Sequence, residues 1–194
     1  MFNKEFPRKA RNVTSGLIAG TLVERAAGWT PVEDLRIGDA VHSYDGGLAR
    51  VVGLDRDWIT AATGAYVLSL PGGALDNCSD LLLLPGQNVL VDTLGDADFP
   101  DELVVLMPVA ALEGMLGTTR ARIAKPMEVI RPRFADDEAI FVNSGTLLHC
   151  PGIRQNDVQS ASTFFTTLDT AEAAAFFRRT YGAHAAHPQH RRAA

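Results

Sequence analysis

Short apolar runs alternate with turn residues over most of the chain, from Gly20 to about Gly152. Closely spaced runs of this length, separated by glycine and proline, are typical of short β-strands joined by tight turns. The pattern predicts strands at Thr21–Glu24, Ala40–Tyr44, Ala49–Leu54, Ala65–Leu70, Asp80–Leu84, Asn88–Asp92, Leu103–Pro108, Met127–Ile130 and Ala139–Asn143. We therefore expect an all-β unit.

A helix is predicted only after this β region. Asp169 and Glu172 stand at N-cap and N3 spacing ahead of a segment rich in alanine and phenylalanine. This arrangement predicts a short C-terminal helix that ends near Tyr181 and packs its apolar face on its own domain. A shorter helix or turn is expected at Val109–Leu116, directly after Pro108.

The composition indicates one folded domain with appended ends. The 194 residues, 46% hydrophobic and 21% charged, are enough to bury one apolar core. We expect a basic N-terminal arm at residues 1–14, a β domain at 15–153, an extension with the helix at 154–182 and a disordered tail at 183–194.

Charge is distributed unevenly along the chain. Residues 1–11 carry a net charge of +3, residues 12–172 carry −12 and residues 173–194 carry +4, which together give the formal net charge of −5. A body this acidic repels phosphate backbones, so no nucleic-acid partner is expected. No apolar run is long enough for a membrane span. Residues 1–11 lack the apolar stretch of a Sec signal peptide, so the expected location is cytoplasmic, with secretion by another route left open.

Two stretches near the start carry the most specific pattern. Ala19–Glu24 reads A-G-T-L-V-E, and Trp29–Gly46 reads W-T-P-V-E-D-L-R-I-G-D-A-V-H-S-Y-D-G. Together they resemble the opening of Hint (Hedgehog/intein) domains of the bacterial branch, where an A-G-T strand precedes P-V-E-x-L-x-x-G-D and V-x-x-x-D-G. Later segments agree in order and spacing with the same family: Asp80–Val91, Val105–Leu112 and Ile140–Gly145. The resemblance implies a Hint-like horseshoe of mostly antiparallel β-strands.

Active Hint domains convert the peptide bond before a Cys or Ser into a thioester or ester. The resemblance implies that a Thr/Ser-x-x-His element polarises the scissile carbonyl and protonates the leaving amine. In this chain the nucleophile position is Gly16, the hydroxyl position is Leu84 and the histidine position is Gln87. None of these side chains can do the chemistry, since glutamine is neither a general acid nor a base near neutral pH. The domain is therefore expected to be degenerate, with no catalytic residues.

Three functions remain in view at this point. The first is a non-catalytic structural or protein-interaction module that binds a protein partner. The second is an autoprocessing protein that uses Ser15, one residue out of register, or Cys150 in the sequence His149-Cys150-Pro151. The third is a component of a phage-like or secretion-associated assembly. Fold alone does not decide among them.

No cofactor or metal site is expected. His184, His187 and His190 have a ligand-like spacing but Pro188 interrupts any helix there, so a His-rich tail is the favoured interpretation. Cys78 and Cys150 are expected to be buried free thiols, although a disulfide or a partial metal site with His149 stays open. Two acidic groups lack calcium-loop spacing and are interpreted as solvated loops: Asp96, Asp98, Asp101 and Glu102, and Asp136, Asp137 and Glu138.

Overall fold

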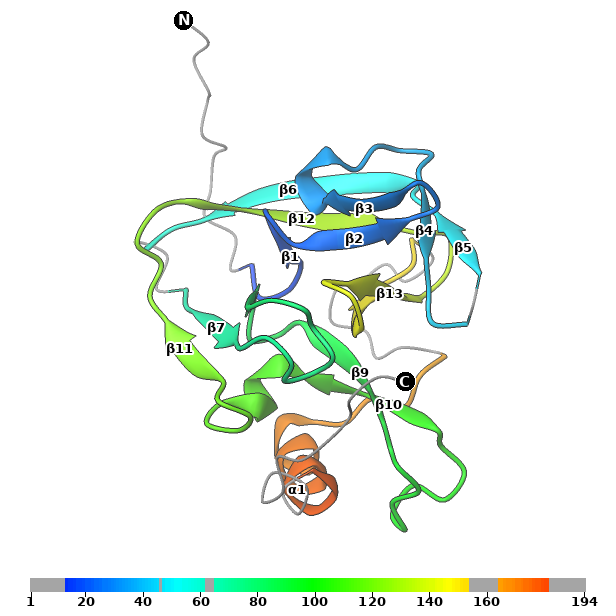
Figure 1. Ribbon diagram of the computed structural model, residues 1–194, viewed down its shortest axis with the longest axis vertical. Helices are drawn as coiled ribbons and strands as arrows, with labels where there is room; N and C mark the ends of the chain where they lie inside the picture. The colour runs from blue at the N-terminus through cyan, green and yellow to red at the C-terminus, as the bar shows by residue number, and fades with distance from the viewer. Residues whose placement is uncertain (1–12, 46, 62–64, 154–163, 182–194) are drawn as a thin grey trace, which may run out of the picture.

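The computed structural model describes residues 13–45, 47–61, 65–153 and 164–181, and in this part of the chain strands dominate (Figure 1). The strands are β1 (Leu17–Ile18), β2 (Leu22–Arg25), β3 (Gly28–Pro31), β4 (Ala40–His42), β5 (Leu48–Arg50), β6 (Gly53–Ile59), β7 (Val67–Leu70), β8 (Leu81–Leu83), β9 (Asn88–Asp92), β10 (Val104–Pro108), β11 (Thr119–Ala121), β12 (Met127–Arg133), β13 (Glu138–Val142) and β14 (Thr146–Cys150). Two 3-10 turns, η1 (Val32–Asp34) and η3 (Val109–Leu112), and one helix, α1 (Thr170–Thr180), complete the described elements.

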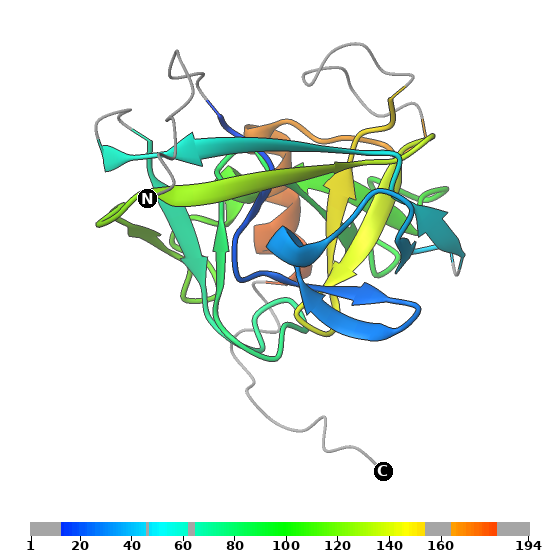
Figure 2. The same cartoon turned by 90° about the horizontal axis from the view of Figure 1, so that it is seen from above.

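These strands form two sheets in which the named strands pair antiparallel. One sheet has six strands in the order β11-β7-β8-β1-β12-β6. The other has eight, in the order β10-β9-β14-β13-β2-β4-β5, with β3 paired to β2. Seen from above, β6 and β12 run side by side along one side of the molecule (Figure 2). The predicted class, mostly antiparallel β with a short C-terminal helix, is confirmed.

The predicted strand at Ala49–Leu54 is wrong in one respect, because the chain changes sheets within it. β5 pairs with β4 in the eight-stranded sheet, whereas β6 pairs with β12 in the six-stranded sheet. Val51 donates its N–H to the carbonyl of Asp39, and Val52 donates its N–H to the carbonyl of Arg133. The two residues between β5 and β6 thus bond to different sheets, and the apolar run continues across the crossing.

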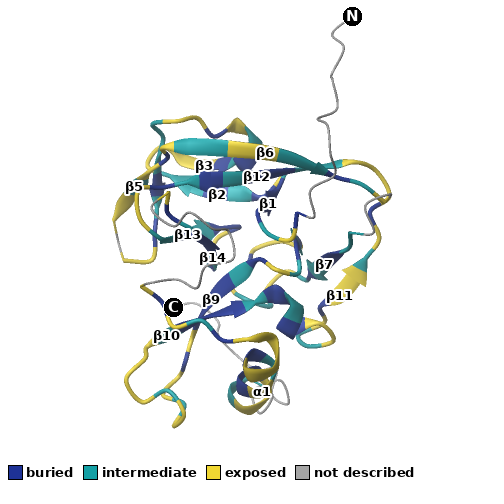
Figure 3. Cartoon of the chain, turned by 180° about the vertical axis from the view of Figure 1, so that it is seen from behind, coloured by how far each residue is buried: buried dark blue, intermediate teal, exposed yellow. Residues whose placement is uncertain are grey.

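Most of the buried apolar side chains lie where the sheets face each other. The largest core cluster includes Leu17, Leu68, Met107, Phe134 and Leu148, each no more than 1% exposed. Burial is concentrated inside the curled sheets and on the inner side of α1, while the loops and the far side of α1 are exposed (Figure 3). No helix among the described residues is long and apolar enough to cross a membrane.

Helix α1 begins and packs as the sequence predicts. The Asp169 carboxylate accepts the N–H groups of Ala171 and Glu172 at 2.7 and 2.8 Å, and the Glu172 carboxylate accepts the N–H of Asp169. Phe176 and Phe177 are buried against the domain. The expected solvated loop around Asp96 is wrong for that residue, because its carboxylate binds Arg179 and Thr180 of α1.

Replacing Asp169 with alanine is expected to lower the free energy of unfolding by about 1 kcal/mol, since two N–H groups of the first turn lose their acceptor. Urea denaturation followed by circular dichroism measures the loss. Thr170→Ala, one position along on the exposed surface, is the matched control and should change stability little. Equal effects of the two substitutions would contradict the capping role.

Several sequence predictions fall on residues outside the described ranges. They are the structure of the arm through residue 12, the disordered tail at 183–194 and the His184, His187 and His190 run. Val13 and Thr14, at the end of the expected arm, are described: Val13 is buried in a small apolar cluster, and the Thr14 carbonyl accepts the N–H of Gly86.

Candidate functional site

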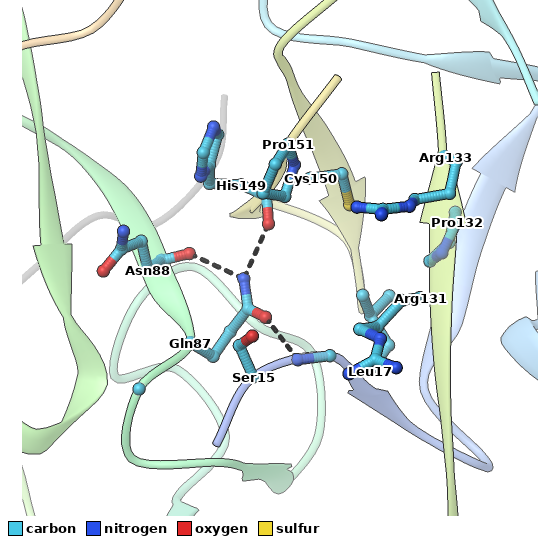
Figure 4. Close-up of a pocket in the computed structure, with 12 residues that line it drawn as sticks. Ser15, Leu17, Gln87, Asn88, Arg131, Pro132, Arg133, His149, Cys150 and Pro151 are labelled. Carbon is cyan, nitrogen blue, oxygen red and sulfur yellow. Dashed lines mark hydrogen bonds between the residues drawn. The ribbon is translucent and has the colours of Figure 1, made fainter. Parts of the chain in front are cut away.

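The start of β1 and the end of β14 meet at a small cavity of about 50 Å³. The turn between β8 and β9 forms one wall, and the end of β12 forms another (Figure 4). Lining residues are Ser15, Gly16, Leu17, Gly86, Gln87, Asn88, Arg131, Pro132, Arg133, His149, Cys150 and Pro151. A space of this size holds a few water molecules at most and no larger ligand. The site therefore depends on contacts between its own residues.

Gln87 connects three segments at this cavity. Its side-chain oxygen accepts the N–H of Gly16 at 2.9 Å, and its side-chain nitrogen donates to the carbonyls of His149 at 2.8 Å and Asn88 at 3.0 Å (Figure 4). The side chain is only 2% exposed. Because Gln87 has no proton to release near neutral pH, it accepts at the Gly16 nitrogen and cannot protonate it.

Gly16 has a backbone conformation and surroundings that favour glycine. Its φ is +122°, a region that side chains rarely adopt. A Cβ atom added there would lie 2.6 Å from Cγ1 of Val129 and 2.8 Å from Cγ of Arg131. A nucleophilic side chain at this position would therefore require the neighbouring strand β12 to shift.

Leu84 and Gln87 lie on either side of the Pro85-Gly86 turn, which is closed by a 3.0 Å hydrogen bond from the Gln87 N–H to the Leu84 carbonyl. The Leu84 side chain is fully buried in the small apolar cluster that also contains Ile18 and Val129. Leu84 thus packs in an apolar cluster and offers no hydroxyl to the cavity.

Ser15 is half-buried and lines the cavity next to Gly16. The carbonyl before it, that of Thr14, accepts the N–H of Gly86 at 2.8 Å. Such a bond polarises a carbonyl. From Leu17 onward β1 pairs residue for residue with β12, at Leu17 with Ile130 and Ile18 with Val129.

Cys150 lies at the end of β14 and is fully buried, with Arg133 beside it in the cavity wall (Figure 4). Burial, with a smaller contribution from the Glu138 carboxylate, raises the pKa of the Cys150 thiol to about 12, although the Arg133 guanidinium acts in the opposite direction. Since the thiolate is the reactive form, Cys150 is a poor nucleophile in the folded protein. Cys78, expected to be buried, is instead exposed, and both thiols are free.

The His149 ring points away from the Gln87 amide (Figure 4) and packs edge-on against Phe165. Its Nε2 lies 3.6 Å from Oδ2 of Asp137, too long for a hydrogen bond. Burial lowers the pKa of His149 below its usual 6.5, and the nearby Asp137 carboxylate only partly offsets this effect. The ring is therefore held neutral, on the side of β14 away from the cavity.

The His149 shift predicts that stability falls as the pH drops below about 6.5, because the unfolded chain takes up a proton that the folded chain excludes. Glu138 acts with the opposite sign, since burial raises the pKa of its carboxyl and favours the folded state at lower pH. The effect of His149 is thus measured by comparing wild type with His149→Gln.

Urea midpoints at about pH 7 and about pH 5.5 give the comparison, with a limit of about 1.4 kcal/mol per pH unit for one group. The wild type should lose more stability on acidification than His149→Gln. Parallel pH profiles of the two proteins would contradict a buried neutral His149.

The family motifs mark Leu84 and Gln87 around one turn and Gly16 at the start of a strand. They do not indicate the residues that β12 contributes to the site. Arg131 and Arg133 pair with Asp57 and Asp55 of β6 across the sheet. Nothing in the order of these residues links β12 to Gly16. Only the pairing of β1 with β12 brings them together.

Comparisons with known proteins agree with this architecture. The family model described as "Hint domain" matches residues 15–149. The comparison with curated proteins found no match. Similar solved structures include a bacterial intein-like domain from Clostridium thermocellum (14% identity, 71% of this chain and 99% of that chain, TM-score 0.47). A splice-inactive variant of the AceL NrdHF class 3 split intein is also similar (11%, 71% and 98%, TM-score 0.50). At these identities the likeness concerns the fold alone.

Proposed function

The chain belongs to the Hint domain family, and we propose that it is a non-catalytic member retained as a structural or protein-interaction module. One contact carries this proposal: the N–H of Gly16 donates to the Gln87 side-chain oxygen at 2.9 Å. In the chemistry that the family resemblance implies, that nitrogen would leave and would need a proton. Here it faces an acceptor, and Gly16 has no side chain to attack the preceding carbonyl.

The buried surroundings of the site also support this function. A nucleophilic side chain placed at Gly16 would collide with Val129 and Arg131. At the position of the family hydroxyl, Leu84 is buried in an apolar cluster. Several separate features would thus have to change together. The residues at the cavity instead join β1, β8, β9 and β14 through Gln87 and its turn, a stabilising role.

A rival within the same family is autoprocessing at Ser15, and one observation favours it. The Thr14 carbonyl that Ser15 would attack already accepts the Gly86 N–H. Attack by Ser15 would still need a base to take its proton and an acid for the departing nitrogen. Gln87, at the position of the family histidine, supplies neither.

The partner of the module is proposed to be a protein, in the cytoplasm. The net charge of −12 over residues 12–172 disfavours a nucleic acid. Such a module could act as a component of a phage-like or secretion-associated assembly, which is the third candidate function.

The Cys150 route is tested by alkylating the folded full-length chain with iodoacetamide and mapping the labelled thiols by mass spectrometry. Cys78 should react and Cys150 should stay unlabelled until the protein is unfolded, because a buried thiol with a pKa of about 12 is almost entirely protonated at neutral pH. Cys78→Ser provides the matched control, in which folded protein should take up no label. Rapid labelling of Cys150 in folded protein would contradict the non-catalytic proposal.

A further inference from the structure

A second depression, separate from the Gly16 cavity, lies across β9, β10 and β14 of the eight-stranded sheet. Its volume is about 340 Å³, within the range of roughly 300–1,000 Å³ of ligand-binding clefts. We call it the tyrosine groove, and its lining residues are Tyr44, Ala74, Leu75, Asp76, Leu90, Val91, Asp92, Val104, Gly145, Thr146, Leu147 and Tyr181.

The tyrosine groove has an apolar floor. Leu90 is 5% exposed and belongs to a small cluster against which Val104 and Leu147 pack. Tyr44 also lines the groove and packs edge-on against Phe165. A floor of this kind favours apolar side chains in whatever covers it.

The groove also carries negative charge. Asp76 and Asp92 both line it, and among the described residues neither carboxylate pairs with a Lys or Arg side chain. The Asp92 carboxylate accepts the N–H of Leu94 at 2.6 Å. Burial raises the pKa of Tyr181 to about 12, and the charges of Asp92 and Asp76 act in the same direction. The field here therefore favours a cationic occupant.

The chain leaves α1 at the edge of this groove. The Tyr181 hydroxyl donates to the Asp92 carbonyl at 2.8 Å, and the ring stacks on Phe177 with a centroid distance of 4.4 Å. Tyr181, the last described residue, therefore lies at the edge of the groove. Residues 182–194 contain five alanines, three histidines, Arg191 and Arg192, and no acidic residue.

We infer that the tyrosine groove is the docking site of the chain's own segment 182–194, with alanines over the apolar floor and Arg191 and Arg192 near Asp76 and Asp92. Ten extended residues span up to about 35 Å, so Arg191 reaches across the site from Tyr181. Attachment at Tyr181 makes docking intramolecular and raises the effective concentration of the segment. The inference does not depend on whether the Gly16 cavity is catalytic.

Paramagnetic relaxation in the full-length chain tests this docking. A nitroxide is attached at Ala194→Cys in a Cys78→Ser background, where the buried Cys150 stays unlabelled. Backbone amide signals of Leu90 and Leu147 should broaden, while that of Trp58 on β6 should not. Asp76→Asn with Asp92→Asn should weaken docking by about fivefold, as expected for two exposed ion pairs. The matched control Glu24→Gln with Asp34→Asn removes two charges outside the groove and should leave the broadening unchanged.

Broadening confined to the last residues of α1, or spread evenly over the surface, would overturn the inference. So would equal broadening in the two double variants. A mixture of nitroxide-labelled unenriched chain with ¹⁵N-enriched chain that lacks the nitroxide separates docking within one chain from docking between copies. If Leu90 and Leu147 broaden in that mixture as much as in the chain that carries both the nitroxide and ¹⁵N, a second copy supplies the segment. That result would also overturn the inference.

Discussion

Replacing Gly16 with cysteine, which would restore the family nucleophile, is expected to lower the free energy of unfolding by about 2–5 kcal/mol. Two costs add. The backbone is held at φ +122°, and the new Cβ would lie 2.6 Å from Cγ1 of Val129 and 2.8 Å from Cγ of Arg131. Urea denaturation of purified wild type and variant measures the difference.

Gly20→Ala separates the backbone cost from the steric one. Gly20 also has a positive φ, +95°, but a Cβ added there meets no atom within 4 Å. Its substitution should cost about 1–2 kcal/mol, which is the strain of a left-handed conformation alone. If Gly16→Cys were no more destabilising than Gly20→Ala, the close packing of β1 on β12 at Gly16 would be wrong.

Gln87→Ala is expected to lower the free energy of unfolding by about 2–4 kcal/mol. The substitution leaves the Gly16 N–H and the His149 carbonyl without their partner, and both bonds are buried. A buried polar group that loses its partner costs about 1–3 kcal/mol. Thermal or urea unfolding gives the value.

Asn88→Ala, at the adjacent position, is the control for this substitution. Asn88 is half-buried and contributes its backbone carbonyl to the bond with Gln87, a contact that alanine keeps. Its loss of stability should be well below that of Gln87→Ala. Comparable losses would mean that the turn itself, and not the Gln87 amide, stabilises the site.

The strands that the sequence revealed are those whose apolar residues stand between turn residues. β9 has the predicted bounds, Asn88–Asp92. The part of β6 after Leu54 was missed because three consecutive charged residues, Asp55, Arg56 and Asp57, interrupt its apolar pattern. The structure explains them as partners of β12 side chains: Arg56 with Glu128, Asp57 with Arg131 and Asp55 with Arg133. Pairing across strands is not encoded in local periodicity.

Only those site residues that align with family motifs could be predicted from the sequence. Alignment with those motifs marked Gly16, Leu84 and Gln87 as substituted positions, and the structure adds the hydrogen bond between Gly16 and Gln87. The steric reason for glycine at position 16 comes from Val129 and Arg131, more than 110 residues later in the chain. Such long-range contacts leave no local pattern in the sequence.

We propose that this Hint domain does not cleave itself. Intact mass spectrometry of the full-length chain, incubated with hydroxylamine or a thiol, tests it most directly. Loss of general acid–base help alone removes about two to four orders of magnitude in rate, and Gly16 also lacks the nucleophile. Wild type, Ser15→Ala and Cys150→Ala should all keep their full-length mass. Time-dependent release of the Met1–Thr14 peptide from wild type, abolished by Ser15→Ala, would contradict the claim, as would a cut after His149 that requires Cys150.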